Sequence, residues 1–202
     1  MLVKKRMAQK LVTVTKDKGI SEAIKLMKKH SIRHLPVVEG DNLIGFVTES
    51  DMRQVYLASL IDEMLIEDVM IKKPITISPD INIEEAAELI YHNKIGGLPV
   101  VENGKLKGIL TVADILEAFI EMMGVLESSS RIDVILGEEP GAFEEVSRTI
   151  KSHRGKIISV GMLDYEKSES EKIYFFRLKK CDVAPIAESL KKEGYQVKSV
   201  TK

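Results

Sequence analysis

The chain repeats one segment of its own sequence, and this repeat limits the fold more than any other feature. Residues 11–51 align without a gap with residues 74–114, at a constant offset of 63, and 16 of the 41 aligned positions are identical. The pattern Gly-x-x-Thr-x-x-Asp closes both copies, as GFVTESD at 45–51 and as GILTVAD at 108–114. A repeat of this kind indicates two copies of one structural unit that bury a common core between them.

Each copy predicts the same order of elements. A β-rich run comes first, at 11–15 and at 74–78, and a segment with apolar residues at helical spacing follows. The shared LPVV run, a polar turn and a returning run then predict a β-hairpin. Thr48 or Thr111 opens a second helix. We therefore expect two β-α-β-β-α units related by a pseudo-twofold axis.

The Thr-x-x-Asp part of the motif has two interpretations. Thr48 and Thr111 lie three residues before an acid, as in a capping box with Asp in place of the usual Glu. Such a cap stabilises a helix by about 1 kcal/mol. The same geometry suits a nucleotide, because a helix N-terminus attracts phosphate and Asp51 or Asp114 can accept hydrogen bonds from a ribose diol. A glycine in the strand before each motif admits the close approach of a backbone or a ligand.

The doubled LPVV and Gly-x-x-Thr-x-x-Asp motifs resemble a cystathionine-β-synthase (CBS) domain pair, over about residues 7–122. The resemblance implies a cleft between the units that takes AMP, ADP, ATP or S-adenosylmethionine as a regulatory ligand. It also implies that Asp51 and Asp114 hold the ribose, with Thr48 and Thr111 beside them. The alternative is a CBS pair that serves as a scaffold and binds no nucleotide.

Two basic residues precede LPVV in the first copy only. Arg33 and His34 align with two glycines of the second copy. A guanidinium suits phosphate, and a bound phosphate raises the pKa of a histidine. We expect both residues to contact phosphate, although both can also be ordinary surface residues. The half of the cleft with Thr48 and Asp51 is then the better anion site, unless Arg33 reaches across the cleft to the second site.

The last third of the chain predicts a different fold. After a polar linker at 125–130, residues 131–202 follow the order βαββαβ of a ferredoxin-like domain. This order and the turn EEPGAFEEV resemble an ACT domain. The resemblance implies a role in dimerisation or signal transmission, and it maps a turn that can hold an amino acid onto Gly141. A Pro-Gly turn needs no ligand to explain it.

The predicted fold class is therefore mixed α+β and α/β. CBS units occupy 1–60 and 61–124, a linker occupies 125–130, and an ACT-like domain occupies 131–202. The complete order resembles the acetoin-utilisation protein B family along nearly the whole chain, although that family name specifies no reaction. By analogy with both families we expect a homodimer and a regulated protein partner.

Composition excludes several other classes. The net charge of −1 argues against direct DNA binding. A single cysteine, Cys181, rules out an intrachain disulfide and is typical of a cytoplasmic protein. No apolar run reaches the roughly 18 residues that would span a membrane.

No catalytic residues or metal ligands can be assigned, because the sequence has no nucleophile–base pair, no Cys/His cluster and no Walker-type loop. We therefore expect a regulatory sensor that is not an enzyme and has no catalytic cofactor. The alternative function is a scaffold whose ACT-like domain binds an amino acid or a protein partner.

Overall fold

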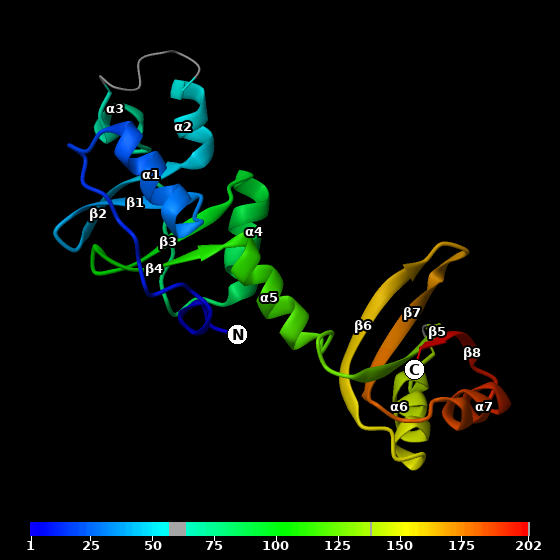
Figure 1. The fold of residues 1–202 in the computed structure, drawn as a ribbon. Coiled ribbons are helices and arrows are strands. Elements are labelled where there is room, and N and C mark those ends of the chain that lie inside the picture. Colours follow the sequence, from blue (N-terminus) through cyan, green and yellow to red (C-terminus); the bar gives the residue numbers. More distant parts are fainter. Residues whose placement is uncertain (57–63, 138, 202) are drawn as a thin grey trace. The chain divides into compact units, whose positions relative to one another are not determined.

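The chain forms two compact units, Met1–Leu116 and Glu117–Lys202, as the ribbon shows (Figure 1). The structure is a computed structural model that describes residues 1–56, 64–137 and 139–201. The predicted boundary between the two CBS units, at residues 60 and 61, lies outside the described residues. The two sequence copies both belong to the first unit.

The first unit contains the helix–strand–strand–helix order predicted for each copy. The first copy forms α1 (Ile20–His30), β1 (His34–Glu39), β2 (Asn42–Thr48) and α2 (Glu49–Tyr56). The second copy forms α4 (Ile83–Asn93), β3 (Gly97–Glu102), β4 (Lys105–Thr111) and α5 (Val112–Met122), and the boundary between the two compact units lies within α5. A short helix precedes each copy, η1 (Val3–Lys5) and α3 (Ile66–Val69).

The β-rich run that opens each copy makes one bridge instead of a strand, so this part of the prediction is wrong. In the first copy Val14 pairs with Val37 in parallel. The Lys16 carbonyl then accepts a hydrogen bond of 3.0 Å from the Glu67 N–H. The second copy repeats both features at the same offset. In each copy, the carbonyl that would continue the strand accepts a hydrogen bond from the segment that precedes the other copy. It is therefore not available to extend the parallel pairing beyond one bridge.

The two copies interlock, because the segment before each copy packs on the other copy. A Cβ added to Gly45 would lie 2.5 Å from Sδ of Met70, and one added to Gly108 would lie 2.6 Å from Sδ of Met7. The expected close approach at the motif glycines is therefore made by a methionine side chain and the carbonyl oxygen of the next residue. Met7 and Met70 are also 63 residues apart, so these contacts extend the repeat to positions before residue 11.

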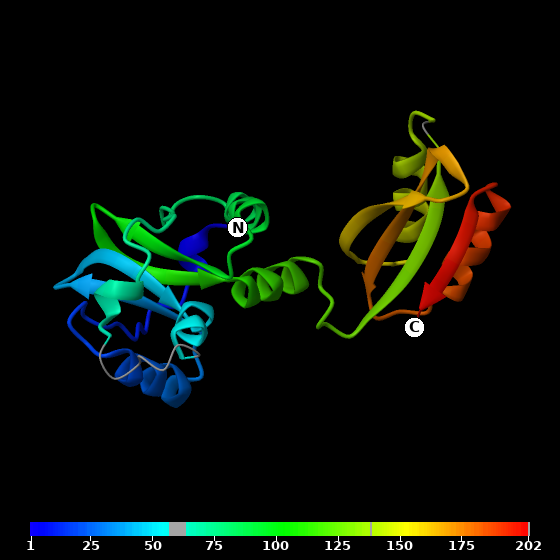
Figure 2. The same cartoon turned by 90° about the horizontal axis from the view of Figure 1, so that it is seen from above.

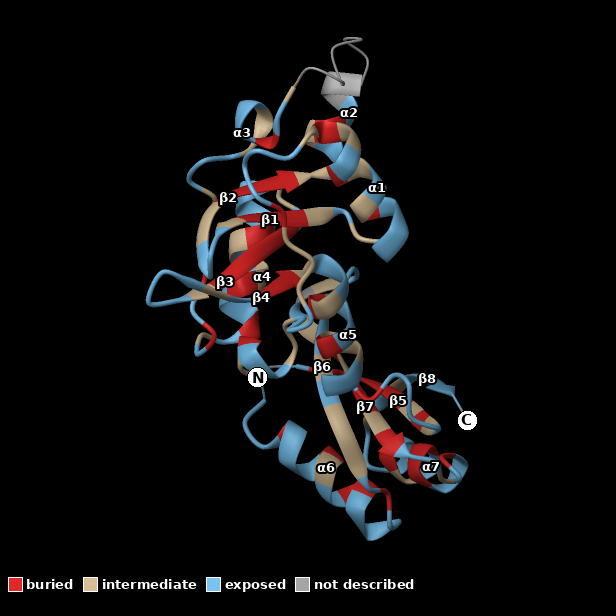
Figure 3. Ribbon diagram, turned by 60° about the vertical axis from the view of Figure 1, so that its left-hand side comes forward, coloured by how far each residue is buried: buried red, intermediate tan, exposed pale blue. Residues whose placement is uncertain are grey.

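The strands of the first unit form one sheet of order β1-β2-β4-β3. Both hairpins are antiparallel, and Asn42 opposite Lys105 joins them. Buried positions concentrate on these strands and on the inner faces of the helices (Figure 3). Helix α1 buries Ile20, Ala23 and Met27, which is the spacing of an amphipathic helix.

The second unit has the predicted βαββαβ order. It comprises β5 (Ser129–Leu136), α6 (Ala142–Ser152), β6 (Ile157–Tyr165), β7 (Ser168–Lys179), α7 (Ala184–Lys192) and β8 (Gln196–Thr201). The sheet has the order β6-β7-β5-β8, and all neighbours are antiparallel. Both helices cover the same face of this sheet and share its core (Figure 2).

Strand β5 begins inside the segment predicted as a linker, 125–130. Ser129 and Ser130 belong to the strand, and Ser130 is buried. The Ser130 hydroxyl donates to the Cys181 carbonyl at 2.9 Å and accepts from the Cys181 N–H at 3.1 Å. Because the backbone satisfies this hydroxyl, a polar residue is buried here, and composition alone misplaces the boundary.

Candidate functional site

The two Thr-x-x-Asp motifs form capping boxes at the starts of α2 and α5. Oδ2 of Asp51 accepts hydrogen bonds from the N–H and the hydroxyl of Thr48, both at 2.8 Å, and the Asp51 N–H donates to that hydroxyl at 3.3 Å. Thr111 and Asp114 repeat the pattern at 2.7, 2.6 and 3.4 Å. The capping interpretation is confirmed. Both boxes use Oδ2 and leave Oδ1 of each aspartate available to a ligand.

A cavity of about 280 Å³ brings residues of both copies together. Arg33 and His34 of the first copy line it with Thr111 and Asp114 of the second copy. Its other lining residues are Ala8, Lys10, Leu11, Val12, Ser31, Ile32, Gly96, Ile109, Val112 and Ala113. The pairing differs from the expected one, because the Thr-Asp pair that shares this cavity with the cations belongs to the other copy. It follows the alternative in which Arg33 reaches across the cleft.

The position of His34 has a steric cause. A Cβ added to Gly96 would lie 2.7 Å from Nε2 of His34, and one added to Gly97 would lie 3.4 Å from it. The imidazole therefore occupies the space that the two glycines leave. It also stacks on Phe46, with ring centroids 5.8 Å apart and an interplanar angle of 19°. Gly96 and Gly97, which align with Arg33 and His34 in the repeat, thus leave the space that the imidazole of His34 fills.

The electrostatic state of His34 without a ligand follows from its surroundings. Burial lowers the pKa of His34 below its ordinary value of 6.5, and the neighbouring Arg33 guanidinium lowers it further. Asp114 and Asp51 oppose this shift. The imidazole is therefore neutral at pH 7 and acts as a hydrogen-bonding group. A bound anion would be needed to raise its pKa.

Lys10 adds a cation that sequence motifs do not single out. It lines the cavity because Ala8 exchanges two backbone hydrogen bonds with Ile109 of β4, at 2.8 and 3.1 Å. The available sequence signal was the equivalence of Met7 and Met70, which extends the repeat toward the N-terminus. That equivalence shows that the segment before residue 11 belongs to the folded unit.

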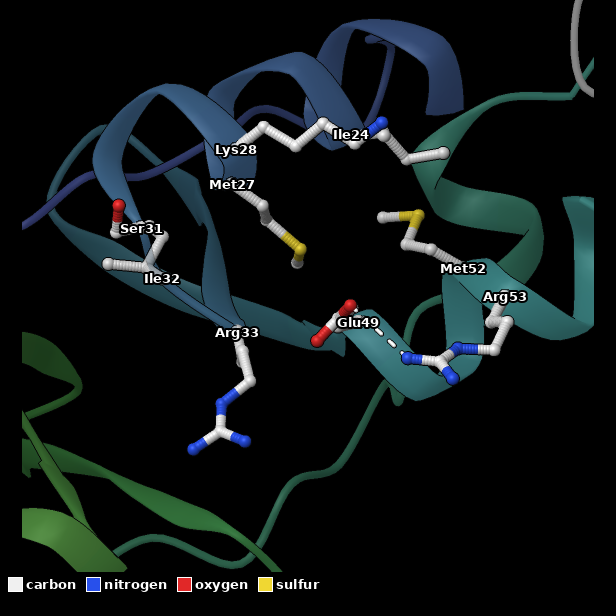
Figure 4. Close-up of a pocket in the computed structure, with 9 residues that line it drawn as sticks. All are labelled: Ile24, Met27, Lys28, Ser31, Ile32, Arg33, Glu49, Met52 and Arg53. Atoms are coloured by element: carbon white, nitrogen blue, oxygen red, sulfur yellow. Dashed lines mark hydrogen bonds and ion pairs between the residues drawn. The ribbon is translucent and has the colours of Figure 1, made fainter.

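A second cavity, of about 490 Å³, lies between α1 and α2 of the first copy. The close-up shows Met27 and Met52 pointing toward one another from the two helices (Figure 4). Arg33 lines this cavity as well as the first. The remaining lining residues are Ile24, Lys28, Ser31, Ile32, Glu49 and Arg53.

Gly141 lies at the start of α6, in the turn where the sequence suggests an amino-acid site. It is the N-cap of that helix and has a φ of 92°, a conformation that favours glycine. A Cβ added there would meet no atom within 4 Å. The turn geometry alone therefore explains this glycine.

The described part of the chain holds neither a metal-binding cluster nor a membrane-spanning helix. In residues 1–56, 64–137 and 139–201, no group of three or more His, Cys, Asp or Glu side chains could hold a metal ion. In the same residues, no helix combines the length and the apolar character needed to traverse a bilayer.

Comparison with known proteins gives a family for the first unit. The family model for the CBS domain matches residues 3–58 and 66–121, more than half of the chain, and nothing after residue 121. An inosine-5'-monophosphate dehydrogenase of Korarchaeum cryptofilum is 41% identical over 106 residues, which are 52% of this chain and 21% of that enzyme. The chain thus spans about a fifth of this relative.

Solved structures of CBS pairs are similar at the level of fold and sequence. The CBS domain pair of protein MJ0100, in complex with 5'-methylthioadenosine and S-adenosyl-L-methionine, is 32% identical with a TM-score of 0.55, covering 59% of this chain and 95% of that one. CBSX2 in complex with AMP is 29% identical with a TM-score of 0.53, covering 59% and 96%. A Vibrio cholerae protein named acetoin utilization protein (AcuB) is 28% identical with a TM-score of 0.57, covering 62% and 94%. With both sequence copies matched, this chain belongs to the CBS domain family.

Proposed function

We propose that this protein is a regulatory sensor, not an enzyme, that binds an adenosine-containing ligand in the cavity between its two CBS units. The observation that carries the proposal is that one cavity joins Arg33 and His34 to Thr111 and Asp114. Two similar CBS structures contain ligands of this class, AMP in one and S-adenosyl-L-methionine with 5'-methylthioadenosine in the other.

Each residue of the cavity has a role that follows from its chemistry. Oδ1 of Asp114 accepts hydrogen bonds from the ribose hydroxyls, while Thr111 fixes the carboxylate through Oδ2. Arg33 and Lys10 pair with phosphate, which a guanidinium binds through two parallel hydrogen bonds. The first turn of α5 also lines the cavity through Val112 and Ala113, and the positive end of the helix dipole favours an anion there.

Thr48 and Asp51 take a different role in this proposal. They form the same capping box, but the positions equivalent to Arg33 and His34 are Gly96 and Gly97 in the other copy. A ligand bound beside the capping box of Thr48 and Asp51 would therefore find no cation at Gly96 or Gly97. We therefore assign Thr48 and Asp51 to helix capping, and to an uncharged ligand group if a second molecule binds.

Calorimetric titration with AMP, ADP, ATP, S-adenosylmethionine, adenosine and 2'-deoxy-AMP tests the proposal. A ligand of this class should bind with micromolar affinity, about −8 kcal/mol. Binding of 2'-deoxy-AMP should be about tenfold weaker than binding of AMP, because one hydroxyl bonded to a carboxylate is missing. Arg33→Ala should weaken AMP more than adenosine, and Lys25→Ala, on the exposed side of α1, should change neither.

Two results would reject this function. One is that no adenosine compound binds the folded protein. The other is that AMP and 2'-deoxy-AMP bind equally, which would leave the ribose diol without a partner. In either case the scaffold function would become the leading one.

We propose in addition that the second unit is ACT-like and makes the protein a homodimer, through which a ligand signal reaches a protein partner. Its strand order supports this, and its edge strand β6 exposes apolar side chains, Val160, Met162 and Leu163. Exposed apolar edge strands favour pairing between chains. Sedimentation equilibrium should give a dimer, and Met162→Lys should shift it toward the monomer. A wild-type monomer at all concentrations would reject the dimer.

A further inference from the structure

The cavity between α1 and α2 combines an apolar floor with a charged rim. Met27 and Met52 form the floor with two isoleucines and are only 4% and 2% exposed. Lys28 and Arg53 stand at the rim, on different helices (Figure 4). A volume of about 490 Å³ lies within the range of roughly 300–1,000 Å³ that is typical of small-molecule sites.

The internal repeat shows which of these features the fold requires. The floor positions are apolar in both copies, as Met27 aligns with Ile90 and Met52 aligns with Ile115. The rim positions are not kept: their counterparts in the second copy are uncharged, namely Tyr91 for Lys28, Gly96 for Arg33, Val112 for Glu49 and Leu116 for Arg53. The second copy folds the same way without these charges. The charged rim of the first copy therefore serves something other than folding.

The charges of the rim leave an excess of positive charge. Nη2 of Arg53 lies 3.2 Å from Oε1 of Glu49, in an exposed pair on one helix turn, and such pairs are worth little. Among the described residues, no carboxylate lies within ion-pair distance of Lys28 or Arg33. The Arg33 guanidinium is directed away from Met27 and Met52 (Figure 4), so one carboxylate, Glu49, is left with two cations, Lys28 and Arg53, at the rim. The net positive charge at the rim attracts an anion. The negative charge of Glu49 repels a dianion, such as a phosphate monoester, more strongly than a singly charged anion.

We propose that this cavity binds a small amphipathic carboxylate. Its apolar body lies against Met27 and Met52, whose unbranched side chains adapt to irregular shapes. Its carboxylate lies between Lys28 and Arg53, where charge-assisted hydrogen bonds form. The site adjoins the nucleotide cavity, with which it shares Ser31, Ile32 and Arg33, but its floor and the rim cations Lys28 and Arg53 belong to this cavity.

Octanoate is the probe for this site, and the methionine methyl groups report its position. In protein labelled with ¹³C at the methyl groups of its nine methionines, octanoate should shift the Met27 and Met52 resonances and leave Met162, in the other unit, unchanged. Leucine substitutions at the two positions assign the signals. Octanol, which has the same tail and no charge, should bind about tenfold more weakly.

Matched variants separate the rim from general surface charge. Lys28→Ala and Arg53→Ala should each weaken octanoate several-fold, whereas Lys25→Ala, an exposed lysine one turn away on α1, should leave the affinity unchanged. The remaining methyl spectrum shows that each variant is folded.

Three outcomes would overturn the proposal. In the first, octanoate at its solubility limit leaves both methionine resonances in place. In the second, octanol binds as tightly as octanoate, so that the rim charges do not contribute. In the third, both resonances move with protein concentration and not with octanoate, which would mean that a second copy of the chain covers the cavity.

Discussion

Gly45→Ala tests the interlocking of the two CBS copies. The added Cβ would lie 2.5 Å from Sδ of Met70, whereas ordinary contact begins at 3.4 Å, so Met70 must move by about 1 Å. Overpacking of this kind costs about 1–3 kcal/mol. Alanine also restricts the unfolded chain more than glycine does, which favours the folded state by about 0.5–1 kcal/mol. The free energy of unfolding should therefore fall by about 1–2 kcal/mol.

A double-mutant cycle identifies the methionine as the cause. In a Met70→Ala background the nearest remaining atom is the Ile71 carbonyl oxygen at 3.3 Å, so Gly45→Ala should cost less than about 0.5 kcal/mol. At Gly108 the corresponding carbonyl is closer, at 3.0 Å, and removal of Met7 should rescue Gly108→Ala less completely. Urea unfolding followed by far-ultraviolet circular dichroism measures these values. Equal costs of Gly45→Ala with and without Met70 would refute the reasoning.

Three further predictions concern the candidate site. Thr48→Ala and Thr111→Ala should each lower the free energy of unfolding by about 1 kcal/mol in urea titrations, since each removes one cap. In calorimetry, only Thr111→Ala should also weaken the binding of AMP. An equal loss of AMP binding in both variants would contradict this. The folded pKa of His34 lies below its ordinary value, so His34 favours the folded state fully above pH 6.5, and this contribution is lost as the pH falls through the folded pKa. A His34→Gln variant should therefore show a smaller loss of stability on acidification than the wild type, and an NMR titration of His34 with a midpoint above 6.5 would contradict the stated burial. Arg33→Ala should weaken AMP much more than octanoate, because the Arg33 guanidinium is directed away from the cavity between α1 and α2 although Arg33 lines both cavities; an equal loss for the two ligands would contradict this.

The elements that depend on local sequence could be predicted. The spacing of Ile20, Ala23 and Met27 gives the buried face of α1, and Thr48 and Asp51 give the start of α2 through contacts three residues apart. The order of elements in the second unit follows from the same kind of pattern. In each case the residues that decide the structure lie within one or two turns of each other.

The errors occurred where contacts between distant segments decide the structure. His34 was expected beside the Thr-Asp pair of its own copy, but it fits over Gly96 of the other copy, which periodicity cannot show. The run around Val14 has strand composition, but its neighbour Lys16 bonds to residue 67. The cavity between α1 and α2 leaves no motif, because its lining comes from three separate stretches of the first copy.

The most direct test of the central claim compares Asp114→Ala with Asp51→Ala in one calorimetric titration with AMP. Both variants lose the same capping hydrogen bonds, so both should lose about 1 kcal/mol of stability. Of these two aspartates, Asp114 is the one that lines the cavity of about 280 Å³ with Arg33 and His34. We predict that Asp114→Ala weakens AMP by more than about tenfold while Asp51→Ala binds like the wild type. The account is contradicted if Asp51→Ala loses as much affinity as Asp114→Ala, or if Asp114→Ala binds AMP unchanged.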